Sequence, residues 1–157
     1  MVEILNLLKG SDQPAEDQKA FLKAQIIFWL IGATDGHGKN FSIFLGTGGR
    51  FILTPFYDVL TAQPFFDAHQ IQKKEMKMAM SVGSNNHYKM EEIHGRHFVQ
   101  TAQKAGLPDY LAKEALEEIS AMAEKAMQAI EKSLPHDFPE EIHESVIRSM
   151  ESRLKSM

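Results

Sequence analysis

The sequence predicts a mainly α-helical domain with a small antiparallel β element, an α+β fold that spans residues 1–157. Three observations favour this fold class. Apolar residues recur at helical spacing in several segments, two short β-prone runs flank a glycine-rich turn, and one further stretch alternates between apolar and polar residues as strands do. A chain of this length can build one domain with its own apolar core.

The first long helix is expected from residue 14 to residue 31. The stretch SDQPAEDQ places Pro14 in the first turn, followed by acidic residues, which the positive end of the helix dipole stabilises. Apolar residues from Phe21 to Ile31 then recur at helical spacing. We expect Gly32 to end this helix.

A β-hairpin is expected over residues 41–54, where the runs FSIFL and RFILT are separated by GTGG. The segment PFYDVL, residues 55–60, follows directly. After an irregular stretch, EMKMAMSV alternates strictly and places three methionines and Val82 on one face of a strand. We expect this face to pack in the core rather than to bind a partner.

The rest of the chain, residues 91–156, is expected to be helical. One helix should run from Glu91 to Ala105, a second from Pro108 to Ser133, and a third should start near Pro139. Two of these helices carry apolar stripes, which we expect to pack in the core. The stripes consist of Leu111, Ala115, Ile119, Met122, Ala126 and Ile130 in one helix, and Ile142, Val146, Met150 and Leu154 in the other.

The composition excludes several classes of function. The chain has no cysteine, so disulfides, thiolate catalysis and cysteine-bound zinc are excluded, and a cytoplasmic location is expected. The longest apolar run, residues 26–31, is too short to cross a bilayer, and the first residues do not form a signal peptide. The net charge of −4 gives no general reason to expect nucleic-acid binding.

The loop GATDGHGKN, residues 32–40, gathers an acid, a histidine, a lysine and an asparagine. A phosphate-binding P-loop is rejected, because position 33 is alanine, Asn40 replaces Ser or Thr, and the loop follows a helix. A structural interpretation is a tight turn in which Gly36 and Gly38 supply positive φ angles and Asp35 caps.

Phosphoryl transfer is the interpretation that the wider pattern favours. In kinase-like sites an Asp takes the proton of the attacking hydroxyl, an Asn five residues later holds magnesium, and a second Asp bridges the metal and the phosphates. Asp35 and Asn40 have this spacing, and Asp58 follows after the predicted hairpin. His37 and Lys39 add donors near the place where charge accumulates on the phosphate oxygens.

At the level of families, LIGATDGHGKNFSIFL, LTPFYDVL, and KMAMSVG with NHY downstream resemble the HipA-like serine/threonine kinases. These kinases are the toxins of bacterial toxin–antitoxin modules. The D-x-H-x-x-N form of the loop also looks like that of phosphatidylinositol kinases, which makes a lipid kinase a lesser alternative. The resemblance covers nearly all of the chain and implies the helical C-terminal lobe of a protein-kinase-like fold.

The resemblance implies a role for each residue of the two loops. Asp35 falls on the catalytic base, and Asn40 and Asp58 fall on the magnesium ligands. The ATP-binding positions would be His37, Gly38, Lys39, Asn40, Tyr57 and Asp58. The implied cofactors are ATP and Mg²⁺, and the implied substrate is a protein. The implied partner is a helix-turn-helix antitoxin of the HipB type, and the chain would contact DNA only indirectly, through this antitoxin.

The resemblance also implies an N-terminal kinase lobe, which supplies a phosphate loop, a strand-borne lysine and the adenine-binding hinge. About thirty residues precede Asp35, and they read as a helix. We therefore expect a lobe that is inactive without its complement, with an exposed apolar face that promotes self-association. The alternative is a non-enzymatic module that binds an antitoxin or the complementary lobe.

His94 and His97 lie three residues apart on a predicted helix and could share a face. Zinc would need further ligands at fixed spacing, and none is apparent. We expect both histidines to be ordinary surface or interface residues.

Overall fold

The computed structural model describes all 157 residues and is mainly helical, which confirms the predicted fold class. The helices are α1 (Val2–Leu8), α2 (Pro14–Ile31), α3 (Gln63–Asp67), α4 (Gly95–Lys104), α5 (Asp109–Ser133) and α6 (Glu140–Leu154). The strands are β1 (Ile43–Leu45), β2 (Phe51–Leu53), β3 (Lys77–Val82) and β4 (His87–Lys89). They form two separate antiparallel pairs, β1–β2 and β3–β4.

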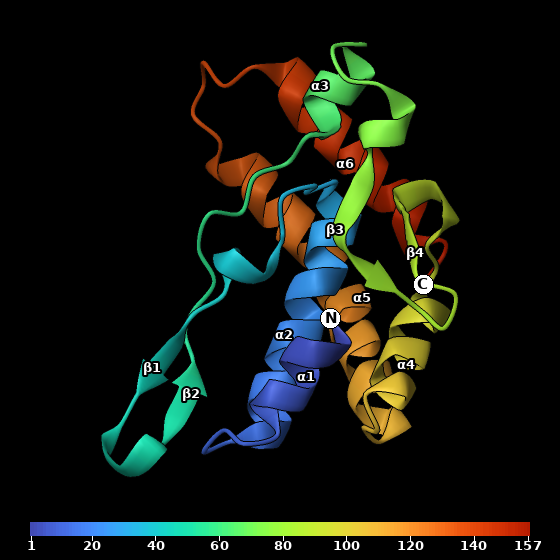
Figure 1. Cartoon of the computed structure of the whole chain (residues 1–157). Coiled ribbons are helices and arrows are strands. Elements are labelled where there is room, and N and C mark those ends of the chain that lie inside the picture. The colour runs from blue at the N-terminus through green and yellow to red at the C-terminus, as the bar shows by residue number, and fades with distance from the viewer.

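Helix α2 is the centre of the domain, with α1, α5 and α6 packed around it and α4 packed on α5 (Figure 1). Phe21, Trp29 and Phe98 are the largest fully buried side chains. The indole Nε1 of Trp29 donates to the carbonyl oxygen of Met90 at 3.0 Å, so its single polar atom is satisfied inside the core. The apolar core therefore lies mainly between α2 and the helices of the second half of the chain.

Helix α2 has the bounds that the sequence predicts, Pro14 to Ile31. Its end is a Schellman motif. Gly32 has a φ of 73°, its N–H donates to the Trp29 carbonyl, and the N–H of Ala33 donates to the Phe28 carbonyl. A left-handed residue is required here, which explains why a glycine separates the helix from the following loop.

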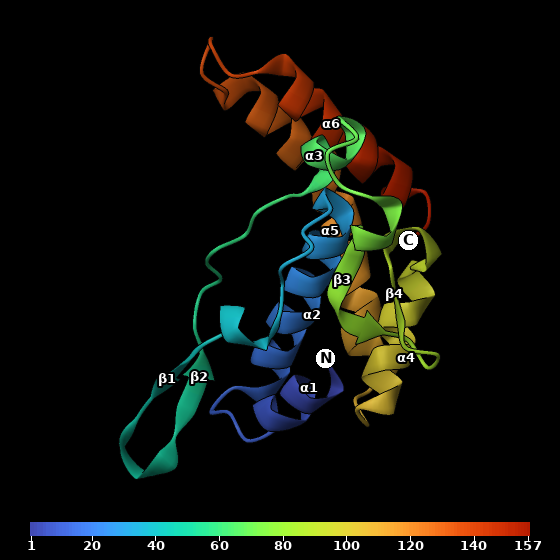
Figure 2. The same ribbon diagram turned by 45° about the horizontal axis from the view of Figure 1, so that its top comes forward.

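The predicted hairpin is confirmed and projects away from the helices, as both views show (Figures 1 and 2). The buried carboxylate of Asp17 in α2 accepts a hydrogen bond from the N–H of Leu53 in β2 at 2.9 Å. Burial alone would raise the pKa of Asp17, but hydrogen bonds from Gln13, Ser11 and Leu53 outweigh burial and lower it. This carboxylate therefore stays charged and ties the hairpin to α2.

Most of the alternating stretch is a strand, β3, which begins at Lys77. Its predicted inner face packs in the core, where Met76, Met78 and Val82 are buried and Met80 is partly buried. Its partner β4 was not predicted. The next helix begins at Gly95, not at Glu91, because residues 90–92 form a 3-10 turn. His94 is the N-cap of α4, and its backbone N–H donates to Nδ1 of His97.

The stripes of α5 and α6 are only partly core. Leu111 and Ala115 are buried, but Met122 is 63% exposed and Ile130 is 47% exposed. These outer residues line an apolar groove of about 470 Å³ between α2, α5 and α6. The expectation that both stripes pack in the core is therefore wrong, because their outer residues, including Ile142 of α6 at 39% exposure, line this open groove.

His97 is also not a surface residue, since it is 5% exposed and its ring stacks on that of His87 at 4.2 Å. The short helices α1 and α3 had no separate prediction. None of the helices has both the length and the apolar character needed to cross a membrane.

Candidate active site

The loop after α2 runs from Ala33 to Asn40 and ends in a 3-10 turn, Gly38–Asn40. Gly36 is required by a close approach, because a Cβ atom at this position would lie 2.2 Å from Cδ2 of the buried Phe28 ring. Neither Gly36 nor Gly38 has a positive φ, so the interpretation that they supply such angles is wrong. The loop lies flat against α2, and its glycine supplies space rather than unusual backbone angles.

Asp35 lies on the outer side of this loop with its side chain 76% exposed. Its Oδ1 atom is 3.4 Å from Nε2 of His37, and its carbonyl oxygen accepts the N–H of His37 at 2.9 Å. The other Asp35 oxygen has no partner. The carboxylate is therefore accessible to a hydroxyl group from another molecule, as a general base must be.

Asn40 and Asp58 come together from opposite sides of the hairpin. Nδ2 of Asn40 donates to Oδ2 of Asp58 at 3.2 Å. Asn40 is 6% exposed, and its Oδ1 atom is buried without any hydrogen-bond partner. Leaving such an oxygen unsatisfied costs about 1–3 kcal/mol.

This pair fits a magnesium ion. Mg²⁺ binds carboxylate and amide oxygens and keeps several waters. The orphaned Oδ1 of Asn40 and the exposed carboxylate of Asp58 are ligands of that kind, and a cation would satisfy the buried oxygen. The backbone of Asp58 has a φ of 55°, a left-handed conformation that is unusual for a residue other than glycine.

Tyr57 and Lys39 connect the two loops. The hydroxyl of Tyr57 lies 2.7 Å from Oγ of Ser42 and donates to the carbonyl oxygen of Lys39 at 3.3 Å. The ammonium group of Lys39 makes no ion pair within 4.0 Å, so it is free to meet an anion. Gly38 is open, with no neighbouring atom nearer to its Cβ position than Ile4 Cδ1 at 4.0 Å.

The floor of the site is aromatic, which the sequence analysis missed. The ring of Phe41 contacts Phe21 edge-on at 4.9 Å, Phe28 at 6.1 Å and Phe56 edge-on at 5.9 Å between centroids. Edge-on contacts are the favoured arrangement of such rings. Phe41 follows Asn40, and Phe56 precedes Tyr57, so this cluster joins both loops to α2. The apolar character of these four positions is visible in the sequence, but their proximity is not.

The segment after Asp58 returns to the end of α2. The hydroxyl of Thr61 donates to the Ile31 carbonyl, and the N–H of Ala62 donates to the Gly32 carbonyl at 2.9 Å. The loop that carries Asp35 therefore starts at the same place where the segment after Asp58 ends. The structure thus joins Asn40 to Asp58 and Asp35 to His37, and the backbone N–H of Asn40 donates to the His37 carbonyl at 3.0 Å. No hydrogen bond or ion pair links the Asp35 side chain to Asn40 or Asp58.

Comparison with known proteins gives a family. The sequence model of the family described as "HipA-like C-terminal domain" matches residues 1–129. A protein of Sinorhizobium fredii (strain NBRC 101917 / NGR234), named "Putative kinase Y4mE", is 36% identical over 77 residues, which are 49% of this chain and 17% of that protein. The matched stretch therefore covers less than a fifth of the length of this relative.

A solved structure shares the fold. It is described as the toxin–antitoxin system of Shewanella oneidensis MR-1, containing HipA, HipB and operator DNA. The superposition has a TM-score of 0.77 at 21% identity and covers 99% of this chain and 34% of the other chain. At this identity the similarity concerns the fold.

Proposed function

Because the chain belongs to the HipA-like C-terminal domain family, we propose that it is the catalytic lobe of an ATP- and magnesium-dependent serine/threonine protein kinase of a toxin–antitoxin module. The observation that carries the proposal is the pair of Asn40 and Asp58. The buried amide oxygen of Asn40 has no partner, and Asn40 lies beside the exposed carboxylate of Asp58. Asn40 follows a second exposed carboxylate, Asp35, by five residues. Phosphoryl transfer uses these groups in this order.

In the proposed reaction, Asp35 accepts the proton of a serine or threonine hydroxyl. The hydroxyl oxygen bonds to the γ-phosphorus of ATP while the bond from that phosphorus to the β–γ bridging oxygen breaks, and ADP leaves. Lys39 and His37 donate to phosphate oxygens, where negative charge accumulates. Magnesium, held by Asn40 and Asp58, would neutralise part of that charge.

We further propose that activity requires an N-terminal kinase lobe, in the same polypeptide or in another. The two relatives are much longer than the stretch that this chain matches. The hairpin and the segment after it present exposed apolar side chains close to the site, among them Phe44 at 58%, Leu45 at 78% and Leu60 at 71% exposure. Exposed apolar patches of this kind mark interaction surfaces.

The proposed partners are a helix-turn-helix antitoxin of the HipB type and a protein substrate. The support is the Shewanella oneidensis structure, whose description names HipA, HipB and operator DNA. With a net charge of −4, the chain is expected to reach DNA only through the antitoxin.

The second candidate is a binding module without activity, and the exposed apolar hairpin favours it. The two candidates differ in what Asp35 does. A kinase lobe supplied with its complement should lose phosphoryl transfer in Asp35→Asn. A binding module should keep its partner affinity in Asp35→Asn and in Asp58→Asn.

The first test is calorimetric titration with ATP and Mg²⁺ of the wild type, Asp58→Asn and the control Asp137→Asn, which changes an exposed acid in the loop before α6. We expect Asp58→Asn to weaken binding by at least about tenfold, because it removes a charged metal ligand, and Asp137→Asn to leave binding unchanged. Equal affinity in all three proteins would contradict the metal site.

A further inference from the structure

Arg153, near the end of α6, connects the start of one active-site loop with the end of the other. We propose that Arg153 is a positioning residue, which holds the Asp35 loop and the Asp58 segment at a fixed separation. This inference rests on the proposed function for the meaning of the two loops. Its geometry stands by itself and can be tested without any nucleotide.

The first contact of Arg153 is with the end of α2. Its Nη1 atom donates to the carbonyl oxygen of Leu30 at 2.9 Å and to Oγ of Ser149 at 2.5 Å, and Ser149 also donates to the Leu30 carbonyl at 3.1 Å. Leu30 lies in the last turn of α2, two residues before Gly32. The last carbonyls of a helix have no intrahelical partner, so Arg153 and Ser149 act as its cap.

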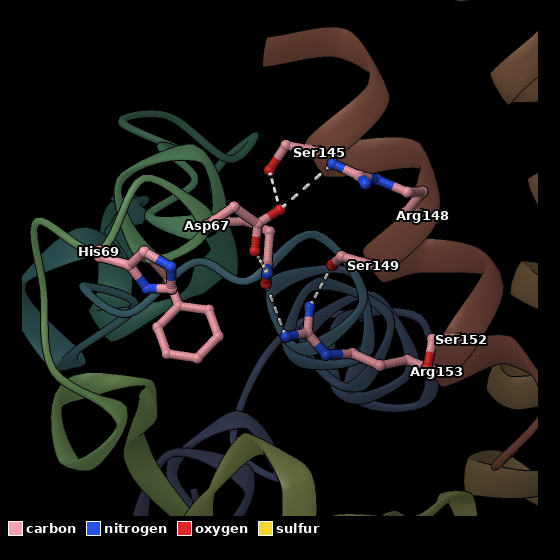
Figure 3. Close-up of a pocket in the computed structure, with 9 residues that line it drawn as sticks. Asp67, His69, Ser145, Arg148, Ser149, Ser152 and Arg153 are labelled. Atoms are coloured by element: carbon pink, nitrogen blue, oxygen red, sulfur yellow. Dashed lines mark hydrogen bonds and ion pairs between the residues drawn. The ribbon is translucent and has the colours of Figure 1, made fainter. Parts of the chain in front are cut away.

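The second contact of Arg153 is with the residue that follows the Asp58 segment. Its Nη2 atom donates to Oε1 of Gln63 at 2.9 Å. Gln63 is the first residue of α3 and lies five positions after Asp58. One planar guanidinium group therefore binds both ends of the loop system. Figure 3 shows Arg153 and Ser149 of α6 beside Asp67 in the adjoining pocket.

The orientation of the Gln63 amide is fixed by a second group of contacts. Its Nε2 atom donates to Oδ1 of Asp67 at 2.9 Å, and the other Asp67 oxygen accepts the hydroxyl of Ser145 at 2.7 Å (Figure 3). Because the nitrogen of Gln63 must face the carboxylate, its oxygen faces Arg153. Helix α6 thus holds Gln63 from two positions, Ser145 and Arg153.

The charge of Arg153 suits a helix cap better than a bound anion. Burial lowers the pKa of Arg153 to about 10, against the opposing effect of Asp67, so the guanidinium stays charged at neutral pH. No carboxylate lies within 4.0 Å of it. Its charge instead meets the negative end of the α2 dipole at Leu30. The adjoining pocket contains the carboxylate of Asp67 as well as Arg148, so cations alone do not line it.

Helix α6 lies beyond residue 129, outside the part of the chain that the family model matches. The proposed positioning contacts therefore come from a segment with no role in the family match. If these contacts are lost, both loops should become more mobile, although the proposed metal ligands and the proposed base are themselves unchanged in sequence.

The test compares Arg153→Ala with Arg148→Ala. Arg148 is on the same helix and lines the same pocket, but it is exposed and contacts neither Leu30 nor Gln63, and its ion pair with Asp67 is long, at 3.9 Å. Amide hydrogen exchange should be at least about tenfold faster in Arg153→Ala at Ala33 and Ala62, whose N–H groups close the two loops onto α2. It should stay unchanged in the middle of α5. Arg148→Ala should match the wild type throughout.

Chemical rescue separates positioning from a general loss of packing. The pocket next to Arg153 has a volume of about 560 Å³, so methylguanidinium at millimolar concentration can reach the vacated position. We expect it to restore slow exchange at Ala33 and Ala62 in Arg153→Ala. The same solute should have no effect in the double variant Arg153→Ala/Gln63→Leu, which lacks one acceptor.

Mn²⁺ titration, followed through the broadening of the Asn40 side-chain amide signals, connects the contacts to the site. We expect Arg153→Ala to bind Mn²⁺ about tenfold more weakly than the wild type, and methylguanidinium to restore the affinity. Unchanged exchange in Arg153→Ala would overturn the positioning role. An absence of Mn²⁺ binding in the wild type would instead contradict the proposed metal site, while the exchange result still decides the role of Arg153.

Discussion

Helix α2 and the β1–β2 hairpin are both rich in large apolar residues, yet they are in opposite environments. Phe21 and Trp29 of α2 are at most 1% exposed, whereas Phe44 and Leu45 of β1 are 58% and 78% exposed. Helix α2 is surrounded by other helices, and the hairpin extends into solvent (Figure 2). The apolar content of a segment alone therefore does not decide whether it is buried. Burial also requires another element of the fold that packs against the segment.

The two regions also differ in role, because the residues that stabilise the fold are largely distinct from those with a proposed role in catalysis. The groups that hold the domain together lie on α2 and its neighbours, whereas Asp35 and Asp58 lie on loops beside the hairpin. Only a few contacts join the two regions, including the aromatic contacts of Phe41 and the hydrogen bond from Leu53 to Asp17. Substitutions should therefore affect either folding or ligand binding, except at the residues that join the regions.

The largest effect on folding is expected for Trp29→Ala. This change removes a fully buried indole, its packing against Phe98 and its hydrogen bond to Met90. The free energy of unfolding should fall by about 3–5 kcal/mol, as measured by urea denaturation. A loss below about 1 kcal/mol would show that α2 is not the centre of the core.

A smaller loss, about 2–3 kcal/mol, is expected for Gly36→Ala, because the new methyl group would overlap the Phe28 ring and must displace the loop or the ring. Gly38→Ala is the matched control, since its Cβ position is open. Urea denaturation of both variants tests the difference. Equal stability of the two variants would mean that the loop does not lie against α2 as described.

The pH dependence of stability should reveal the burial of His97. Burial, with smaller effects from His87, Arg96 and His94, lowers the pKa of His97 from 6.5 to about 4. Below pH 6.5 the unfolded chain takes up a proton that the folded chain accepts only near pH 4, so the free energy of unfolding falls as the pH falls through this range. Between pH 7 and pH 5 this group should contribute a loss of about 2 kcal/mol.

Urea denaturation of the wild type and His97→Gln at these two pH values measures this contribution. The loss should be about 2 kcal/mol smaller in His97→Gln and unchanged in His136→Gln, an exposed control. Identical pH dependence in all three proteins would mean that His97 is not buried in solution.

The smallest effect on folding is expected for Leu45→Ser, within about 0.5 kcal/mol, because this side chain is already in water. The same change should reduce any self-association of the isolated chain, since it removes part of the exposed apolar surface. Sedimentation at high concentration tests this. A loss of stability above about 1 kcal/mol would show that the hairpin packs in solution.

The sequence predicts those parts of the fold whose signals are local. Helix α2 has its proline, acidic first turn and terminal glycine within one continuous segment, and its bounds are as predicted. The start of α4 was misplaced because Glu91 and Glu92 suit a helix, while the contact between His94 and His97 that sets the start depends on the folded backbone. The short elements α1, α3 and β4 carry too few residues to give a pattern.

The candidate site shows the same limit. Asp35, Asn40 and Asp58 are identified by spacing and resemblance, and the structure places the last two in contact. The aromatic floor and Arg153 could not be found in this way. Arg153 lies 90 positions from Gln63, and no periodicity in the sequence brings residues at that separation together.

The left-handed backbone of Asp58 has a consequence for how this sequence could drift under mutation. Glycine fits a φ of 55° better than aspartate does, and asparagine fits it at least as well. Selection for folding alone would therefore let either one replace the carboxylate. A library of variants screened first for abundance and then for metal binding should enrich different residues at position 58, and the difference between the two screens would measure what the acid is kept for.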